Sequence, residues 1–141
     1  NKDGTLDFQF RVRKFDRGFK YSKLNPEALT RYLHDEISRA YGDLNDRYVT
    51  NGLSRLIVIV PEKIELIEIS GRQAFHYRLG GGSDFDAYVI PASEDYFVQI
   101  QFNFIDNSLG GGMQWRKKAQ ADADYIRSSI KIAVGSDSLH D

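Results

Sequence analysis

The chain has 141 residues, of which 41% are hydrophobic and 28% charged, and its formal net charge is −1. This composition excludes a disordered protein and predicts one globular domain over residues 1–141, with a frayed tail at residues 133–141. Cysteine is absent, which excludes a disulfide framework, an iron–sulfur cluster, a thiolate zinc site and a thiol nucleophile.

The N-terminal segment alternates apolar and polar residues, which predicts a β-strand. Phe8, Phe10 and Val12 fall on one face of an extended chain, and we expect Phe8 and Phe10 to be buried. The turn residues Asp16-Arg17-Gly18 come next and predict that residues 5–23 form a β-hairpin.

A helix is expected next. Asn25 can cap free amides, Pro26 suits a first helical turn, and Glu27 complements the helix dipole. We predict a helix over residues 26–41 that ends at Gly42. Its apolar stripe consists of Leu29, Tyr32, Leu33, Ile37 and Ala40.

The middle of the chain has the composition of β-strands. A β-branched run over residues 56–60 is halted by Pro61, and a strand region follows over residues 64–69. Gly71 is expected to form a bend or a bulge. Further period-two segments lie at residues 75–79, 85–90 and 96–104.

The last of these segments has the cleanest alternation in the chain. Its period of two predicts an antiparallel strand with one face in a core and the other facing water. The core face would carry Tyr96, Val98, Ile100, Phe102 and Phe104, and the water face Gln99, Gln101 and Asn103.

A second amphipathic helix is predicted over roughly residues 114–130. Trp115, Ala119, Ala123, Ile126 and Ile130 recur there at steps of four, four, three and four. Together the segments predict an α+β fold in which two helices cover a twisted antiparallel sheet, in the order β-β-α-β-β-β-β-α.

The best candidate for a binding site is a strip on one strand. If Phe75 and Tyr77 face the core, then Arg72, His76 and Arg78 share the opposite face. A plain solvated sheet face explains this pattern, and a site for an anion or an acidic partner is the functional alternative. We predict Arg72, His76 and Arg78 as binding residues.

Other chemically active residues do not converge on a site. His34 lies on the polar side of the first helix, and His140 lies in the tail. Asp84 and Asp86 lie near loops and are interpreted as solvating charge. Gly110 to Gly112 precede a helix, but without a phosphate-binding motif they favour a flexible loop. We predict no metal site, no cofactor and no catalytic residue.

Opposite charges are separated along the chain. Residues 1–24 carry seven Lys/Arg and three Asp (+4), whereas residues 83–108 carry five acidic and no basic residues (−5). We expect recognition through charge and exposed amides rather than a large apolar patch. Basic residues among aromatics are typical of nucleic-acid binding, but one basic hairpin on a chain of net charge −1 would bind phosphate weakly. A protein partner is therefore favoured over nucleic acid.

Three stretches carry a resemblance to a known group. They are Gly71-Arg72-Gln73-Ala74-Phe75-His76-Tyr77-Arg78, Tyr96-Phe97-Val98-Gln99-Ile100-Gln101-Phe102, and Ala123-Asp124-Tyr125-Ile126-Arg127-Ser128-Ser129-Ile130-Lys131-Ile132. In this order they resemble the PsbP/DcrB-like group over roughly residues 55–132. The resemblance implies an α-β-α sandwich in an exported or lipid-anchored accessory protein without catalysis. It transfers no functional residues.

The expected function is that of a non-enzymatic accessory or protein-binding module of the cell envelope. One alternative is a bacterial immunity protein that blocks a toxin. Another is a small-ligand pocket protein or enzyme of scytalone-dehydratase-like fold. No apolar run reaches the roughly 20 residues of a membrane span, and the chain begins with Asn1 rather than Met. The absence of cysteine and the resemblance lead us to expect a periplasmic or other extracytoplasmic location, with any lipid anchor on a missing upstream segment.

Overall fold

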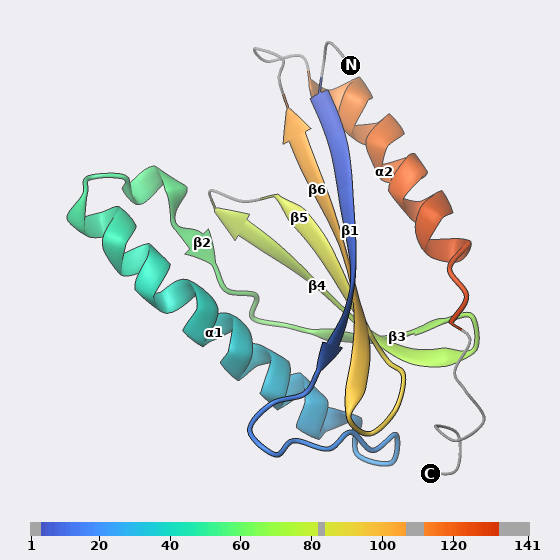
Figure 1. Cartoon of the computed structure of the whole chain (residues 1–141). Helices are drawn as coiled ribbons and strands as arrows, with labels where there is room; N and C mark the ends of the chain where they lie inside the picture. Colours follow the sequence, from blue (N-terminus) through green and yellow to red (C-terminus); the bar gives the residue numbers. More distant parts are fainter. Residues whose placement is uncertain (1–3, 82–83, 107–111, 133–141) are drawn as a thin grey trace.

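The computed structural model describes residues 4–81, 84–106 and 112–132, and it confirms the predicted α+β class (Figure 1). The predicted frayed tail, His140 and the glycines at 110 and 111 lie outside these residues. The elements are β1 (Gly4–Lys14), α1 (Pro26–Thr50), a short 3-10 helix (Ser54–Leu56), β2 (Val58–Ile59), β3 (Glu65–Ile69), β4 (Arg72–Gly81), β5 (Phe85–Pro91), β6 (Tyr96–Asp106) and α2 (Gly112–Ser128).

The described strands form one antiparallel sheet in the order β1-β6-β5-β4-β2, and β3 also pairs with β4. The two helices pack on opposite faces of this sheet, so the layers are helix, sheet and helix (Figure 1). Because β1 is the first strand in this order, its outer edge has no strand beside it in the part of the chain that the structure describes. The sheet therefore has a central strand, β6, and an edge strand, β1, that share the same alternation.

The apolar stripe predicted for the first helix packs on one face of the sheet. Leu29, Tyr32, Leu33 and Ile37 are all buried there, whereas Ala40, also predicted for this stripe, is exposed. The predicted end at Gly42 is wrong, because the helix continues to Thr50.

A tertiary contact accounts for the longer helix. The Nδ2 of Asn45 donates to the carbonyl oxygen of Val58 at 2.8 Å, and its Oδ1 accepts from the Val58 amide at 2.8 Å. Two hydrogen bonds thus fasten the C-terminal part of α1 to β2, which outweighs the weak helix preference of Gly42.

The second helix has the predicted phase. Trp115, Ala119 and Ala123 of α2 are buried against the other face of the sheet. Gly4 makes this approach possible, because a Cβ at Gly4 would lie 2.4 Å from the Trp115 ring. The start of β1 and the start of α2 therefore pack directly against each other.

The predicted hairpin over residues 5–23 is wrong. β1 runs without a break to Lys14 and pairs with β6 along its whole length, and residues 19–23 form no strand. The turn itself forms, since Arg17 and Gly18 have φ values of 56° and 70°. A long strand distant in sequence offered more backbone hydrogen bonds than the short local partner.

The expected burial of Phe8 and Phe10 is also wrong. Their side chains are 52% and 51% exposed, and Val12 is 68% exposed. At this edge of the sheet α2 lies beside the first residues of β1, and no strand of the described residues lies beyond β1. Tyr96, predicted to face the core, is 46% exposed opposite Lys14.

The middle strands differ in length from the prediction. The run over residues 56–60 yields only the two-residue strand β2, because residues 54–56 form the 3-10 helix. Ser70 and Gly71 have φ values of 50° and 79° and join β3 to β4 in a tight turn. Of the two alternatives predicted for Gly71, the bend is therefore confirmed and the bulge is not.

Candidate functional site

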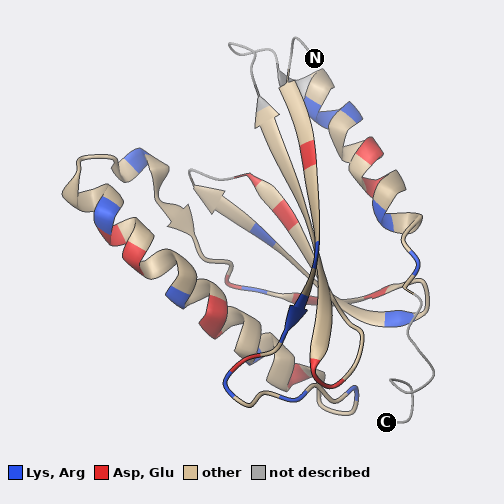
Figure 2. Ribbon diagram, in the orientation of Figure 1, with Lys and Arg blue, Asp and Glu red and all other residues tan. Residues whose placement is uncertain are grey.

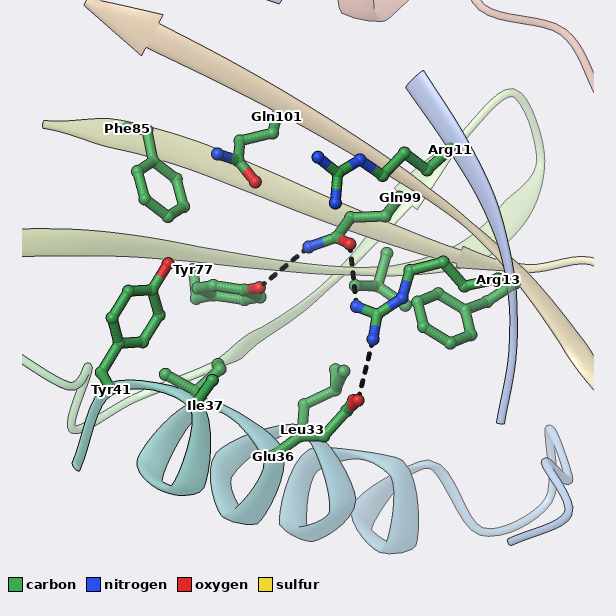
Figure 3. Close-up of a pocket in the computed structure, with 13 residues that line it drawn as sticks. Arg11, Arg13, Leu33, Glu36, Ile37, Tyr41, Tyr77, Phe85, Gln99 and Gln101 are labelled. Atoms are coloured by element: carbon green, nitrogen blue, oxygen red, sulfur yellow. Dashed lines mark hydrogen bonds and ion pairs between the residues drawn. The ribbon is translucent and has the colours of Figure 1, made fainter. Parts of the chain in front are cut away.

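A cleft of about 300 Å³ lies between α1 and the sheet (Figure 3). Its lining combines an apolar floor with arginine, amide and hydroxyl groups. The lining residues are Arg11, Arg13, Leu33, Glu36, Ile37, Ala40, Tyr41, Tyr77, Phe85, Val89, Phe97, Gln99 and Gln101. None of the sequence patterns predicted this cleft.

Strand register assembles the polar wall of the cleft. On β6, Gln99 and Gln101 point to the α1 side together with the buried Phe97. Because β1 pairs with β6, Arg11 lies opposite Gln99 and Arg13 opposite Phe97. The amide face that was expected to meet open water is therefore half-buried and lines the cleft.

A chain of hydrogen bonds holds the inner part of this wall (Figure 3). The Arg13 guanidinium donates to Glu36 Oε1 at 2.9 Å and to Gln99 Oε1 at 3.0 Å. Gln99 Nε2 donates in turn to the Tyr77 hydroxyl at 3.4 Å. Burial raises the pKa of Tyr77 to about 12, so this hydroxyl stays protonated at neutral pH. These side chains are pre-positioned before any ligand arrives.

Arg11 differs from Arg13 in being exposed at the mouth of the cleft. Its Nη2 donates to Gln9 Oε1 at 2.8 Å. Within the described residues Arg11 forms no ion pair, whereas Arg13 pairs with Glu36. The cleft therefore presents one exposed guanidinium beside an apolar floor, a combination that suits a ligand with a carboxylate and an apolar part.

The predicted strip of Arg72, His76 and Arg78 does lie on one face of β4, because Phe75 and Tyr77 are buried on the α1 side. This face belongs to the α2 side of the sheet, away from the cleft. The Arg72 guanidinium donates to the backbone oxygens of Pro91 at 3.1 Å and Ala92 at 3.4 Å. Its place beside the end of β5 is thus set by backbone contacts.

His76 and Arg78 both contact a buried carboxylate. Asp86 is only 3% exposed, with its Oδ1 3.1 Å from His76 Nε2 and 3.0 Å from Arg78 Nε. The His76 ring also stacks on Tyr88, with ring centroids 4.7 Å apart. Burial tends to raise the pKa of Asp86, but the hydrogen bond to His76 and the charge of Arg78 outweigh it and hold this pKa below its usual value.

The interpretation of Asp86 as solvating charge is therefore wrong. Asp84 is exposed, as expected, but it also forms an ion pair with Arg78 at 3.0 Å. Pairing of β4 with β5 places Arg78 directly opposite Asp86 and His76 opposite Tyr88. Sequence reasoning lacked this register, although an Asp flanked by apolar residues in a strand pattern was a usable signal. Arg116 of α2 also contacts Asp84, with its Nε 3.5 Å from Asp84 Oδ2.

The two oppositely charged segments contact each other (Figure 2). Lys20 pairs with Asp95, and the backbone amides of Phe15 and Tyr21 donate to the carbonyl oxygens of Asp95 and Glu94 at 2.8 Å and 2.9 Å. Part of the charge separation seen along the chain is therefore neutralised within the fold rather than presented to a partner.

Two further observations concern ions and membranes. Within residues 4–81, 84–106 and 112–132, no group of three or more His, Cys, Asp or Glu side chains is placed to hold a metal ion. None of the described helices has the length and apolar character needed to cross a membrane. His34 is exposed on α1, as predicted.

The chain matches no protein-family model, no curated protein and no solved structure. The resemblance to the PsbP/DcrB-like group therefore stays a prediction that rests on the sequence patterns alone.

Proposed function

We propose that the protein is a non-enzymatic binding module that holds an acidic, partly apolar segment of a protein partner in the cleft between α1 and the sheet. One observation carries the proposal, namely the exposed guanidinium of Arg11 beside a pre-positioned amide wall and an apolar floor. A carboxylate of the segment would bind Arg11, and an apolar side chain would fill the floor near Ile37 and Phe85.

The size of the cleft favours a protein segment over a large ligand. At about 300 Å³ it lies at the lower limit of small-molecule pockets, which run from roughly 300 to 1,000 Å³. One or two side chains of a partner would occupy it. If the protein is an immunity protein, this partner would be a toxin. The proposed location in the cell envelope rests on the sequence resemblance alone.

Amide NMR titration with three blocked tetrapeptides tests the proposal. The first alternates leucine with glutamate, the second leucine with glutamine and the third leucine with lysine. We expect saturable shifts only with the glutamate peptide, centred on Arg11, Gln99 and Gln101. Ala40→Trp, on the exposed wall of α1, should block the cleft and abolish the shifts.

A matched variant separates blockage from damage to the helix. Arg39 is exposed on the adjacent position of α1 and lies outside the lining of the cleft, so Arg39→Trp should bind the glutamate peptide like the unmodified protein. Equal binding to the lysine peptide, unchanged binding in Ala40→Trp, or no binding of any peptide would each refute the proposal.

A small-ligand carrier is the second candidate, because the same cleft would accept an anionic amphiphile. Octanoate has one carboxylate and one short apolar chain, and it serves as the probe. Tighter binding of octanoate than of the glutamate peptide, lost in Ala40→Trp, would favour the carrier over the protein-binding module.

The strip of Arg72, His76 and Arg78 remains a second proposed contact surface. It is tested by Arg72→Glu/Arg78→Glu in the same titrations and in capture of partners from the source organism. Because this strip lies on the opposite face of the sheet from the cleft, the double variant and Ala40→Trp report on the two surfaces separately. A partner retained equally by the double variant would remove the strip from consideration.

A further inference from the structure

The outer edge of β1 is long and exposed. It covers 11 residues, and every residue from Asp7 to Val12 is exposed. An edge of this length offers unpaired backbone N–H and C=O groups to another strand, and soluble proteins commonly shorten, bulge or cover such an edge. Three large apolar side chains, Phe8, Phe10 and Val12, also remain uncovered beside it.

The sequence of β1 is complementary to itself when it is read in the opposite direction about Gln9. On the α2 face, Phe8 would lie opposite Phe10 of a second copy, and Leu6 opposite Val12 of that copy. On the α1 face, Asp7 would lie opposite Arg11 of the second copy. Each apolar residue meets an apolar one and each Asp7 meets an arginine, both of which are favourable cross-strand pairs.

Neighbouring registers fit less well. A centre at Phe8 would place Arg11 opposite Thr5 and Asp7 opposite Gln9. A centre at Phe10 would place Asp7 opposite Arg13, which already pairs with Glu36. A shift by one residue would bring the apolar face of one copy to the polar face of the other. The centre at Phe10 keeps apolar pairing but makes Asp7 compete with Glu36 for Arg13. The centre at Gln9, where Asp7 meets Arg11, which forms no ion pair among the described residues, therefore fits best.

We propose that two copies of the chain associate through antiparallel pairing of their β1 strands, with the two-fold axis at Gln9. The six-stranded sheet of each copy then continues into that of the other, and the contact is isologous. The mutual Asp7–Arg11 pairs set the register. A guanidinium has five N–H donors, so pairing with Asp7 leaves donors of Arg11 for the cleft.

Pairing of β1 with β3 of another copy is the rival arrangement. β3, at the other side of the sheet, exposes Glu65 and Glu68, so basic β1 pairing with β3 of another copy would produce open head-to-tail chains. The two arrangements predict different assemblies. β1 with β1 closes at a dimer, whereas β1 with β3 grows with concentration.

Engineered disulfides test the register directly, because the chain has no cysteine of its own. Gln9→Cys places two cysteines directly opposite each other across the two-fold axis. The Cα atoms of such a pair lie about 4.5–5.5 Å apart, and disulfides usually join Cα atoms that are about 4.4–6.8 Å apart. We expect a covalent dimer on mild oxidation. Asp7→Cys and Arg11→Cys are the matched controls. In the proposed dimer the two identical thiols would lie about four residues apart along the paired strands, so neither variant alone should form a covalent dimer, whereas a mixture of the two should cross-link.

Charge exchange provides a second test, read by sedimentation equilibrium. Asp7→Arg and Arg11→Asp should each raise the dimer dissociation constant by about tenfold or more, because each creates two like-charge pairs. The double variant Asp7→Arg/Arg11→Asp restores opposite charges across the interface and should regain most of the affinity. Residues 7 and 11 lie too far apart within one strand to rescue each other there.

The outcomes are decisive. These side chains are exposed, so we expect circular dichroism to show a folded chain for every variant. A monomer at all concentrations, cross-linking of Asp7→Cys with itself, or no rescue by the double variant would overturn the proposal. Assemblies larger than a dimer would also overturn it, in favour of head-to-tail pairing of β1 with β3. Peptide binding in the cleft is measured with Ala40→Trp, so failure of the dimer leaves that function separately testable.

Discussion

β1 and β6 pair along their whole length and have the same alternation, yet their apolar faces meet different surroundings. On β6, Ile100 and Phe102 are fully buried. Their cross-strand neighbours on β1, Phe10 and Phe8, are about half exposed. β6 has a strand on both sides and α2 packed on its apolar face, whereas β1 has a strand on one side only among the residues that the structure describes. Alternation therefore predicts which residues share a face, and the position of the strand in the sheet decides how far that face is buried.

The largest expected difference between the two strands concerns Phe8 and Phe102, which lie opposite each other with ring centroids 6.1 Å apart. Phe102→Ala should lower the free energy of unfolding by about 3–5 kcal/mol, because it leaves a cavity in the core. Phe8→Ala should lower it by less than about 1 kcal/mol. Urea denaturation of dilute protein measures both, and equal losses would contradict the comparison.

Charge should show the same contrast. Asp86 lies opposite Phe102 in the sheet. Asp86→Asn should cost about 1.5–3 kcal/mol, because a neutral amide replaces the buried carboxylate that contacts His76 and Arg78. Asp7→Asn on β1 should cost less than about 0.5 kcal/mol in dilute protein, since Asp7 is exposed. Thermal unfolding at neutral pH measures both changes.

The pKa of Asp86 adds a pH test. This pKa is lower in the fold than its ordinary value of 3.8, so the ionised carboxylate stabilises the fold fully above about pH 3.8. That stability is lost as the pH falls below 3.8 and through the folded pKa. The gap in stability between the natural chain and Asp86→Asn should therefore narrow in acid. A gap that stays constant down to pH 2 would contradict this assignment.

The far end of the sheet provides a smaller effect. Asn45→Ala removes both hydrogen bonds to Val58 and should cost about 1–2 kcal/mol. Amide hydrogen exchange should become faster in β2 and in the C-terminal part of α1, and remain unchanged in β1. Asp46→Ala, at an exposed neighbouring position, is the matched control. If amide exchange became equally faster throughout the chain in both variants, the Asn45–Val58 contact would not be what holds α1 to β2.

The smallest effect should come from Val12, which lies opposite Val98. Val98 is 4% exposed, and Val98→Thr should cost about 1–2 kcal/mol for its buried hydroxyl. Val12 is 68% exposed, and Val12→Thr should change stability by less than about 0.5 kcal/mol. The two substitutions are chemically identical, so similar costs would show that β1 is covered in solution.

Local patterns predicted the elements better than their ends and partners. The start of α1 at Pro26 follows from the proline and from Glu27 in the first turn, although the predicted cap is wrong, because the Asn25 side chain forms no capping hydrogen bond. The phase of α2 follows from the spacing of its apolar residues. The end of α1 depends on the contact between Asn45 and Val58, and the pairing of β1 depends on β6. Both contacts join residues distant in sequence, so the local sequence pattern does not predict them. The cleft was missed for the same reason, because Arg11 meets Gln99 only through that pairing.

The pairing of β1 with β6 also governs the order in which the fold can be completed. Lys14 finds its partner only when Tyr96 has been made, and Gly4 only after Asp106. At about 5–20 residues per second, the ribosome needs roughly 5–20 seconds to supply this partner. During that time the alternating apolar residues of β1 are exposed to other nascent chains. Arg11, Arg13 and Lys14 in the same strand are the kind of charged residues that limit aggregation of such a segment.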